Sequence, residues 1–137
     1  MLSNLRNSFW QIDVVDISEL KPHEETYIEH VYRLLRDILD KGYIERPILV
    51  DINSMTILDG HHRVVALKYL NRRRIPVVLI DYLDDNVVKV YSWRSGYMVT
   101  KYDVLYRAKR GLLYPPKTSR HVTSFEIPRI DIDISLL

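Results

Sequence analysis

Residues 24–42 carry the hydrophobic pattern of an amphipathic helix. Apolar side chains recur there mostly at intervals of three and four residues, and charged residues largely fall on the opposite face. The apolar positions are Ile28, Val31, Leu35, Ile38 and Leu39. Glu24 and Glu25 suit the start of a helix, where the macrodipole favours negative charge, and Gly42 suits its end. The pattern therefore predicts a helix that begins close to Glu24 and ends at Gly42.

Short apolar runs elsewhere in the chain predict β-strands. They lie at residues 12–15, 47–52, 55–58, 76–81 and 87–93. The tail, residues 130–134, alternates isoleucine and aspartate, which is typical of a half-buried strand. Helical spacing returns at residues 64–70 and at Lys101–Arg110, which Gly111 closes. The mixed order of helices and strands predicts an α+β fold with a mixed sheet, as a single domain over residues 1–137.

Composition narrows the possible chemistry. The chain has 137 residues and no cysteine. That length allows a hydrophobic core without disulfides or a structural metal, and the missing thiols exclude cysteine nucleophiles, zinc ribbons and iron–sulfur clusters. The sequence has no run of about 18 apolar residues, and Met1–Trp10 lacks the pattern of a secretory leader. We therefore expect a soluble, cytoplasmic protein with no membrane partner.

Basic residues are concentrated toward the C-terminal end. The net charge of +2 does not by itself indicate nucleic acid. Between Val104 and Phe125, however, there are five bases and no acid: Arg107, Lys109, Arg110, Lys117 and Arg120. Such a segment favours an anionic partner, either the phosphate of a small ligand or a nucleic-acid backbone, or is simply solvated. A second basic run, Arg72–Arg74, reads as a solvated turn.

The segment Asp59-Gly60-His61-His62-Arg63 follows a predicted strand and opens a predicted helix. Such a junction offers unpaired backbone N–H groups and a positive dipole end to a phosphate, and Arg63 can add a charge-assisted contact. The alternative is an Asp-Gly turn that only joins two elements, with both histidines at the surface. Adjacent helical histidines diverge, so a histidine-ligated metal is not expected. A hydrated Mg²⁺ on Asp59 and ligand phosphates needs only one or two carboxylates.

Two further segments carry candidate chemistry. Glu24, in Lys21-Pro22-His23-Glu24, could face a ligand, or it could only interact with a helix dipole. Residues 117–121 supply two cations, two hydroxyls and an imidazole that can all donate to phosphate oxygens: Lys117, Thr118, Ser119, Arg120 and His121. A solvated basic loop is the alternative for that segment.

Taken together, these segments resemble the ParB and sulfiredoxin superfamily. The resemblance rests on residues 21–24, on Asp59–Arg63, on Val90-Tyr91-Ser92-Trp93 and on residues 116–121. Within the superfamily, the chain is more similar to the free L-serine kinases, which phosphorylate the amino acid itself to O-phosphoserine. Members of that family carry a long insert where this chain has only residues 94–116, so this is a short form.

The resemblance implies a kinase with Glu24 as general base on the serine hydroxyl and Asp59 organising that hydroxyl or Mg²⁺. Residues Gly60, His61, His62 and Arg63 would hold the phosphates of the donor, which is ATP or ADP, with ATP favoured. Trp93 would form part of the serine pocket. Lys117, Thr118, Ser119, Arg120 and His121 would bind serine and phosphate, within a segment, residues 114–125, that closes the site. Positioning and charge neutralisation are the main requirements of phosphoryl transfer.

Other functions remain as alternatives. Sulfiredoxin activity is excluded, because its catalytic cysteine corresponds to His61 here. A ParB-like nucleotide-binding or nucleic-acid-binding module, including a nuclease, is the main alternative, and a kinase of another small hydroxyl compound is the second. We expect a monomer that binds L-serine and nucleotide, and nucleic acid is not the expected partner.

Overall fold

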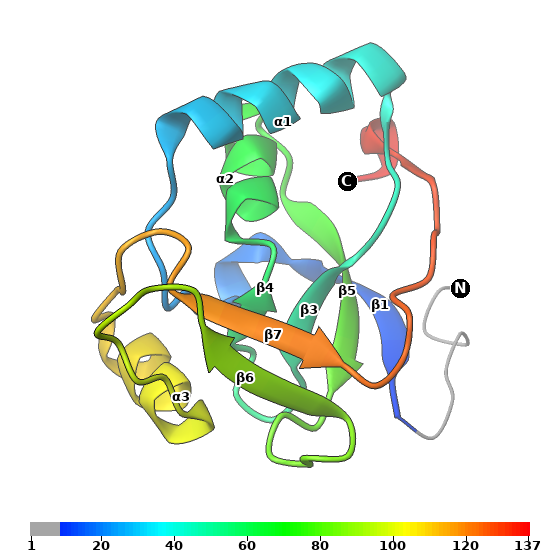
Figure 1. The fold of residues 1–137 in the computed structure, drawn as a ribbon. Coiled ribbons are helices and arrows are strands. Elements are labelled where there is room, and N and C mark those ends of the chain that lie inside the picture. The colour runs from blue at the N-terminus through cyan, green and yellow to red at the C-terminus, as the bar shows by residue number, and fades with distance from the viewer. Residues whose placement is uncertain (1–8) are drawn as a thin grey trace.

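A four-stranded mixed sheet forms the centre of the structure, a computed structural model that describes residues 9–137 (Figure 1). Its strands are β1 (Gln11–Asp16), β5 (Arg74–Ile80), β3 (Ile48–Asp51) and β4 (Ile57–Asp59), in the spatial order β1-β5-β3-β4. The β3 and β5 strands are parallel, and the pairs β1/β5 and β3/β4 are antiparallel. Most of the stretch Met1–Trp10 lies outside the described residues.

Both faces of the sheet are covered, so β3 and β5 are apolar along most of their length. Helices α1 (Ile28–Lys41) and α2 (His61–Tyr69) cover one face, where Val50 and Val77 are fully buried. The other face packs against the antiparallel ribbon of β6 (Val88–Ser92) and β7 (Ser119–Thr123) and against α3 (Lys101–Arg110). The ribbon lies in front of the sheet in Figure 1.

Smaller elements complete the fold. A 3₁₀ turn, η2 (Ile17–Glu19), follows β1, and the two-residue strands β2 (Tyr43–Ile44) and β8 (Ile132–Asp133) pair with each other. The chain ends in a second 3₁₀ turn, η3 (Ile134–Leu136). Within residues 9–137, no helix is long and apolar enough to cross a membrane.

The α+β prediction is confirmed, and three local predictions are wrong. First, α1 begins at Ile28 and not near Glu24, whose backbone forms a parallel bridge with Tyr114. Second, the alternative of a solvated loop for residues 117–121 is wrong for residues 119–123, which form a strand that pairs with β6 over its whole length. Third, the tail is a strand only at Ile132–Asp133, since Asp131 has a φ of 47° that interrupts the extended run.

Gly60 fixes how α2 leaves the sheet. Its φ of 113° is a conformation that side chains disfavour, and a Cβ at this position would overlap the Ile48 side chain in β3. Gly60→Ala should therefore lower the free energy of unfolding by roughly 2 kcal/mol or more. Gly96→Ala is the matched control, because Gly96 also has a positive φ but has open space around it. Urea denaturation of both variants measures the difference, and equal losses would show that the Ile48 overlap does not matter.

Candidate active site

Residues 23–27 lie beside the start of α2, and two histidine side chains hold them there. The His23 N–H donates to His61 Nε2 at 3.1 Å, and the Tyr27 N–H donates to His62 Nε2 at 3.0 Å. Both rings accept through Nε2, so each is neutral with its proton on Nδ1. Burial, and next the neighbouring His23, lower the pKa of His61 well below its usual range; burial and then Lys117 lower the pKa of His62. These side chains therefore position the Glu24 segment, and they are not at the surface as the simple-turn alternative supposed.

Glu24 lies at the centre of a short hydrogen-bond chain. Its Oε1 accepts from the Ser119 N–H at 2.6 Å and from the Ser119 hydroxyl at 2.5 Å. The same hydroxyl lies 2.8 Å from His23 Nε2, and His23 Nδ1 lies 2.7 Å from the Ile57 carbonyl oxygen. Glu24 is 8% exposed and His23 is fully buried, so the chain is largely shielded from water.

The hydrogen bonds around Glu24 limit how their protons can be arranged. The Ile57 carbonyl can only accept, so His23 Nδ1 carries a proton. An ionised Glu24 also only accepts, so Ser119 donates its single proton to Glu24, and the contact with His23 then needs a proton on Nε2. All three contacts are satisfied by an ionised Glu24 with a proton on each His23 nitrogen, and equally by a protonated Glu24 that donates to Ser119 while Ser119 donates to His23 Nε2.

The pKa of Glu24 favours the arrangement in which this carboxyl group is ionised. Burial alone would raise the pKa, but His23 and the two hydrogen bonds from Ser119 outweigh it and lower the pKa of Glu24 to about 2. Oε2 of the same carboxylate has no hydrogen-bond partner within residues 9–137. Glu24 is thus an ionised, buried carboxylate with one oxygen available to a ligand.

His121 lies on the same face of β7 as Ser119, two residues further along. Its Nε2 is 2.8 Å from the hydroxyl of the fully buried Tyr82, whereas its buried Nδ1 has no hydrogen-bond partner in the described part of the chain. Burial, and next Asp51, raise the pKa of Tyr82, so this phenol stays protonated and can donate to Nε2. Nδ1 of a neutral His121 then carries the proton, but this atom is fully buried and the Leu58 backbone lies beside the ring.

Asp59 and Arg63 flank the turn into α2. The Arg63 guanidinium donates to the carbonyls of Arg46 and Pro47, whereas the exposed Asp59 carboxylate has no hydrogen bond or ion pair within residues 9–137. The N-cap of α2, Gly60, has no side chain to accept from the first-turn amides. The described residues have no cluster of three or more metal-ligating side chains. A free carboxylate beside unpaired amides nevertheless fits Mg²⁺, which needs only one or two carboxylates plus phosphates and water.

Three clefts that differ in polarity lie next to the residues described above. A cleft of about 360 Å³ runs along α2 and is mainly apolar, with Glu24, His61 and Lys68 as polar groups on its wall. A second cleft, of about 310 Å³, is polar and is lined by Arg46, Asp59, Arg63, His121, Thr123 and Glu126, with apolar residues at its edge. A wider hollow of about 420 Å³ lies between α1 and the α2 start.

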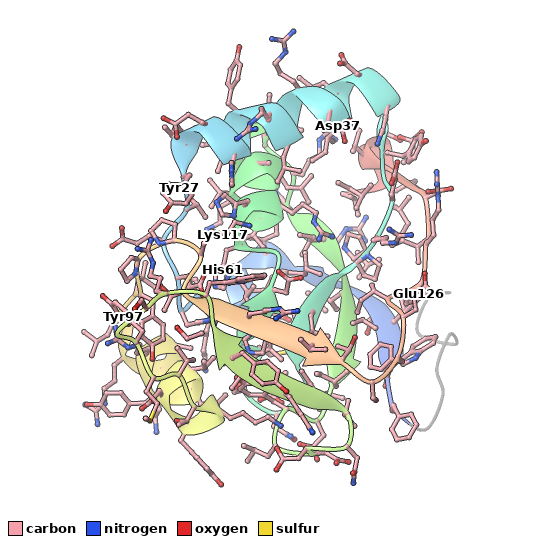
Figure 2. The ribbon with its side chains drawn as sticks, viewed as in Figure 1. Tyr27, Asp37, His61, Tyr97, Lys117 and Glu126 are labelled. Carbon is pink, nitrogen blue, oxygen red and sulfur yellow. The ribbon has the colours of Figure 1, made fainter. Side chains whose placement is uncertain are left out.

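The remaining residues of the segment 117–121 point to different surroundings. Lys117 has a φ of 56° and lines the wide hollow with His62, and Figure 2 labels it below α1. Thr118 is fully buried, and its hydroxyl donates to the Pro115 carbonyl at 2.7 Å, so it serves the loop and not a ligand here. The positive φ of Lys117 costs conformational strain, and such strain often marks a functional position.

Arg120 and Trp93 lie together away from Glu24. Side chains of a strand alternate between faces, so Arg120 points away from the face that carries Ser119 and His121. Its guanidinium lies 4.8 Å from the centre of the Trp93 ring, and both side chains are exposed. Neither residue lines the clefts described above. The structure therefore does not bring these two predicted site residues to the Glu24 carboxylate.

Two site residues are not among those that the sequence singles out as candidates. His23 directly precedes Glu24, and that adjacency was the only local signal for it. Tyr82 follows β5 and reaches His121 through a contact between residues 39 positions apart. No local pattern could indicate a contact of that kind.

The buried histidines make stability depend on pH. The pKa of His121 is lowered to about 3, mainly by burial and next by His23, and the pKa of His61 is lowered as well. Below pH 6.5 these two histidines therefore bind more protons in the unfolded chain than in the folded chain, and their contribution to the free energy of unfolding should fall as the pH drops from 6.5 toward 3. His121 alone should account for about 2 kcal/mol between pH 7 and pH 5.

His121→Gln tests this dependence, because glutamine can still accept from Tyr82 but does not titrate. Urea denaturation at pH 7 and pH 5 should show a smaller loss of stability in the variant than in the wild type. Equal losses would show that His121 is protonated in the folded protein as easily as in the unfolded one.

Several known proteins are similar to this chain in sequence. No protein-family model matches the chain. It is 36% identical to an ATP-dependent L-serine kinase of Staphylothermus marinus over 84 residues, and 29% identical to the ADP-dependent L-serine kinase SerK of Thermococcus kodakarensis over 100 residues. These matches cover 58% and 70% of this chain. A ParB-like protein of Sulfolobus acidocaldarius is 41% identical over 86 residues, or 63% of this chain.

The matched stretch spans 33%, 41% and 42% of the Staphylothermus, Thermococcus and Sulfolobus proteins, so the chain matches less than half of each relative's length. Among solved structures, a free serine kinase in complex with AMP superposes with a TM-score of 0.84, over 96% of this chain and 95% of that chain, at 19% identity. The chain thus has the fold of a free serine kinase and is homologous to proteins named L-serine kinase. The resemblance indicated by the sequence is confirmed.

Proposed function

We propose that this protein is a small-molecule kinase that transfers a phosphoryl group from ATP or ADP to the hydroxyl of free L-serine. One observation carries the proposal: the ionised Glu24 carboxylate already binds a primary alcohol, the Ser119 hydroxyl, beside a helix start with unpaired amides. A base on a hydroxyl and an anion site next to it are the parts that phosphoryl transfer requires. The names of the sequence relatives support the same reaction.

The donor is assigned to the α2 side of the site. The amides of the first turn of α2 would hold its phosphates, because Gly60 leaves them without a side-chain cap. The apolar cleft along α2 starts at His61 and has the size and lining that a nucleoside requires. Asp59 would hold Mg²⁺, which neutralises charge on the transferred phosphoryl group when it is bound. The sequence relatives include both ATP- and ADP-dependent enzymes, and we favour ATP as the donor.

The acceptor is assigned to the β7 side. The polar cleft offers a cation and a carboxylate, Arg46 and Glu126, that suit the charged ends of a free amino acid. Glu24 lines the α2 cleft and not the polar cleft, so the hydroxyl of L-serine would have to extend from the polar cleft toward the start of α2 to donate to the unoccupied Oε2. The carboxylate orients the hydroxyl and takes its proton as the bond to phosphorus forms. His121, on the wall of the polar cleft, would stabilise negative charge on the moving phosphoryl group, and residues 114–125 would close the site.

An acceptor panel tests the assignment. The protein is incubated with Mg²⁺ and either ATP or ADP, together with L-serine, L-threonine, glycerol or no acceptor, and phosphorylated products are identified by mass spectrometry. O-phosphoserine should form from L-serine at the highest rate. Faster phosphorylation of another alcohol would contradict the assigned acceptor. Nucleotide binding without any phosphorylated product would favour the ParB-like module.

A further inference from the structure

Ser119 stands in the same relation to Glu24 as the proposed substrate. Both are primary alcohols, and the Ser119 hydroxyl is hydrogen-bonded to the carboxylate at 2.5 Å and to His23 at 2.8 Å. Two hydroxyls bonded to the two oxygens of one carboxylate lie within about 5–7 Å of each other. A phosphoryl group positioned for one hydroxyl must therefore shift by several ångströms to reach the other.

We propose that Ser119 is itself a phosphoryl acceptor, so that the protein phosphorylates its own β7 strand when free L-serine is absent. The proposal rests on the proposed function, because it uses the same donor and the same base. In the transfer, a bond forms between Ser119 Oγ and phosphorus, and the bond from phosphorus to the leaving nucleotide oxygen breaks. The Oγ proton passes to Glu24 Oε1, and the nucleotide leaves with one phosphate fewer.

The surroundings of Ser119 support this reaction. The side chain is half-buried and belongs to the inward face of β7, which also carries His121 with its unpartnered Nδ1. Lys117, two residues earlier, lines the hollow beside the start of α2. Lys117 is therefore a cation within two residues of Ser119, and a cation so placed stabilises a phosphoryl group in transfer and in the product.

Phosphorylation would also change the site. A phosphoserine carries close to two negative charges at neutral pH, and it would lie against the Glu24 carboxylate. The hydrogen bond from the hydroxyl to Oε1 would be lost, because the phosphate ester oxygen has no proton to donate. Modified protein should therefore phosphorylate free L-serine more slowly than unmodified protein.

Intact-protein mass spectrometry with Mg²⁺ and ATP, and separately with ADP, tests the proposal. Without L-serine, the wild type should gain one phosphoryl group, which tandem mass spectrometry should place on Ser119, and saturating L-serine should slow the labelling. Ser119→Ala and Glu24→Gln should not be labelled at this site. Ser92→Ala is the matched control, because Ser92 lies opposite Ser119 in the ribbon but its hydroxyl donates to the Arg94 carbonyl. This variant should be labelled normally.

The outcomes separate the two proposals. O-phosphoserine formation without any phosphate on Ser119 overturns the Ser119 assignment and leaves the kinase function standing. Phosphate on Ser119 without O-phosphoserine supports Ser119 as acceptor and contradicts free serine as substrate. No phosphorylation of either hydroxyl overturns both. Because localisation is done on the wild type, these outcomes do not depend on whether Ser119→Ala folds.

Discussion

Glu24→Gln is expected to lower kcat for L-serine phosphorylation by about 100-fold or more. Glutamine keeps the size and the hydrogen-bonding oxygen of the side chain but cannot take a proton, so the loss acts on the transition state. The Kd for nucleotide should change little, because the proposed phosphate site is formed by the backbone of α2. Steady-state kinetics together with calorimetric titration of nucleotide measure the two quantities.

Glu29→Gln provides the control, since Glu29 is an exposed acid in the first turn of α1. It should retain wild-type kinetics within about twofold. If Glu24→Gln also retained near-normal turnover, Glu24 would be a structural residue that anchors Ser119, and the proposed base would have to be sought elsewhere.

His121→Gln is expected to reduce kcat/KM by roughly 100-fold, whereas Arg120→Ala should remain within about twofold of the wild type. The two neighbours differ because they point to opposite faces of β7. His121 lines the polar cleft, and Arg120 lies over the exposed Trp93 ring. Glutamine preserves a partner for Tyr82, so the variant loses the imidazole and not the buried hydrogen bond.

Thermal melting must accompany these kinetics, because Tyr82 is part of the hydrophobic core between the sheet and the β6/β7 ribbon, and the His121 ring lies beside it. Loss of activity in His121→Gln at an almost unchanged Tm supports the assigned role. A large effect of Arg120→Ala would show instead that β7 turns its outer face toward the substrate, and it would restore the original expectation that residues 117–121 act as one unit.

The strand–turn–helix around Gly60 was predictable because its signals are local. A short apolar run, an Asp-Gly turn and helical spacing follow one another directly, and α2 begins at His61 as that order indicates. The boundary of α1 was less predictable. Two acids at Glu24 and Glu25 suit a helix start, but backbone pairing with Tyr114, from 90 residues away, keeps them extended.

The segment 117–121 shows why some site residues could not be sorted from the sequence. If residues 117–121 formed a loop, their five polar side chains would be equivalent candidates for the site. As the start of a strand paired with β6, the segment sends Ser119 and His121 to one face and Arg120 to the other. The pairing is set by tertiary contacts, and only the weak alternation in residues 119–123 could have hinted at it. The positioning contacts of His23, His61 and Tyr82 are also long-range.

Phosphorus NMR tests the central claim most directly, because it follows donor and acceptor in one sample. Wild-type protein and Glu24→Gln are compared with Mg²⁺, L-serine and ATP, and then with ADP in place of ATP. The wild type should produce the O-phosphoserine resonance as the terminal phosphate of the donor disappears, and the variant should show almost none over the same time. Release of inorganic phosphate without O-phosphoserine, or equal product from both proteins, would contradict a serine kinase in which Glu24 is the base.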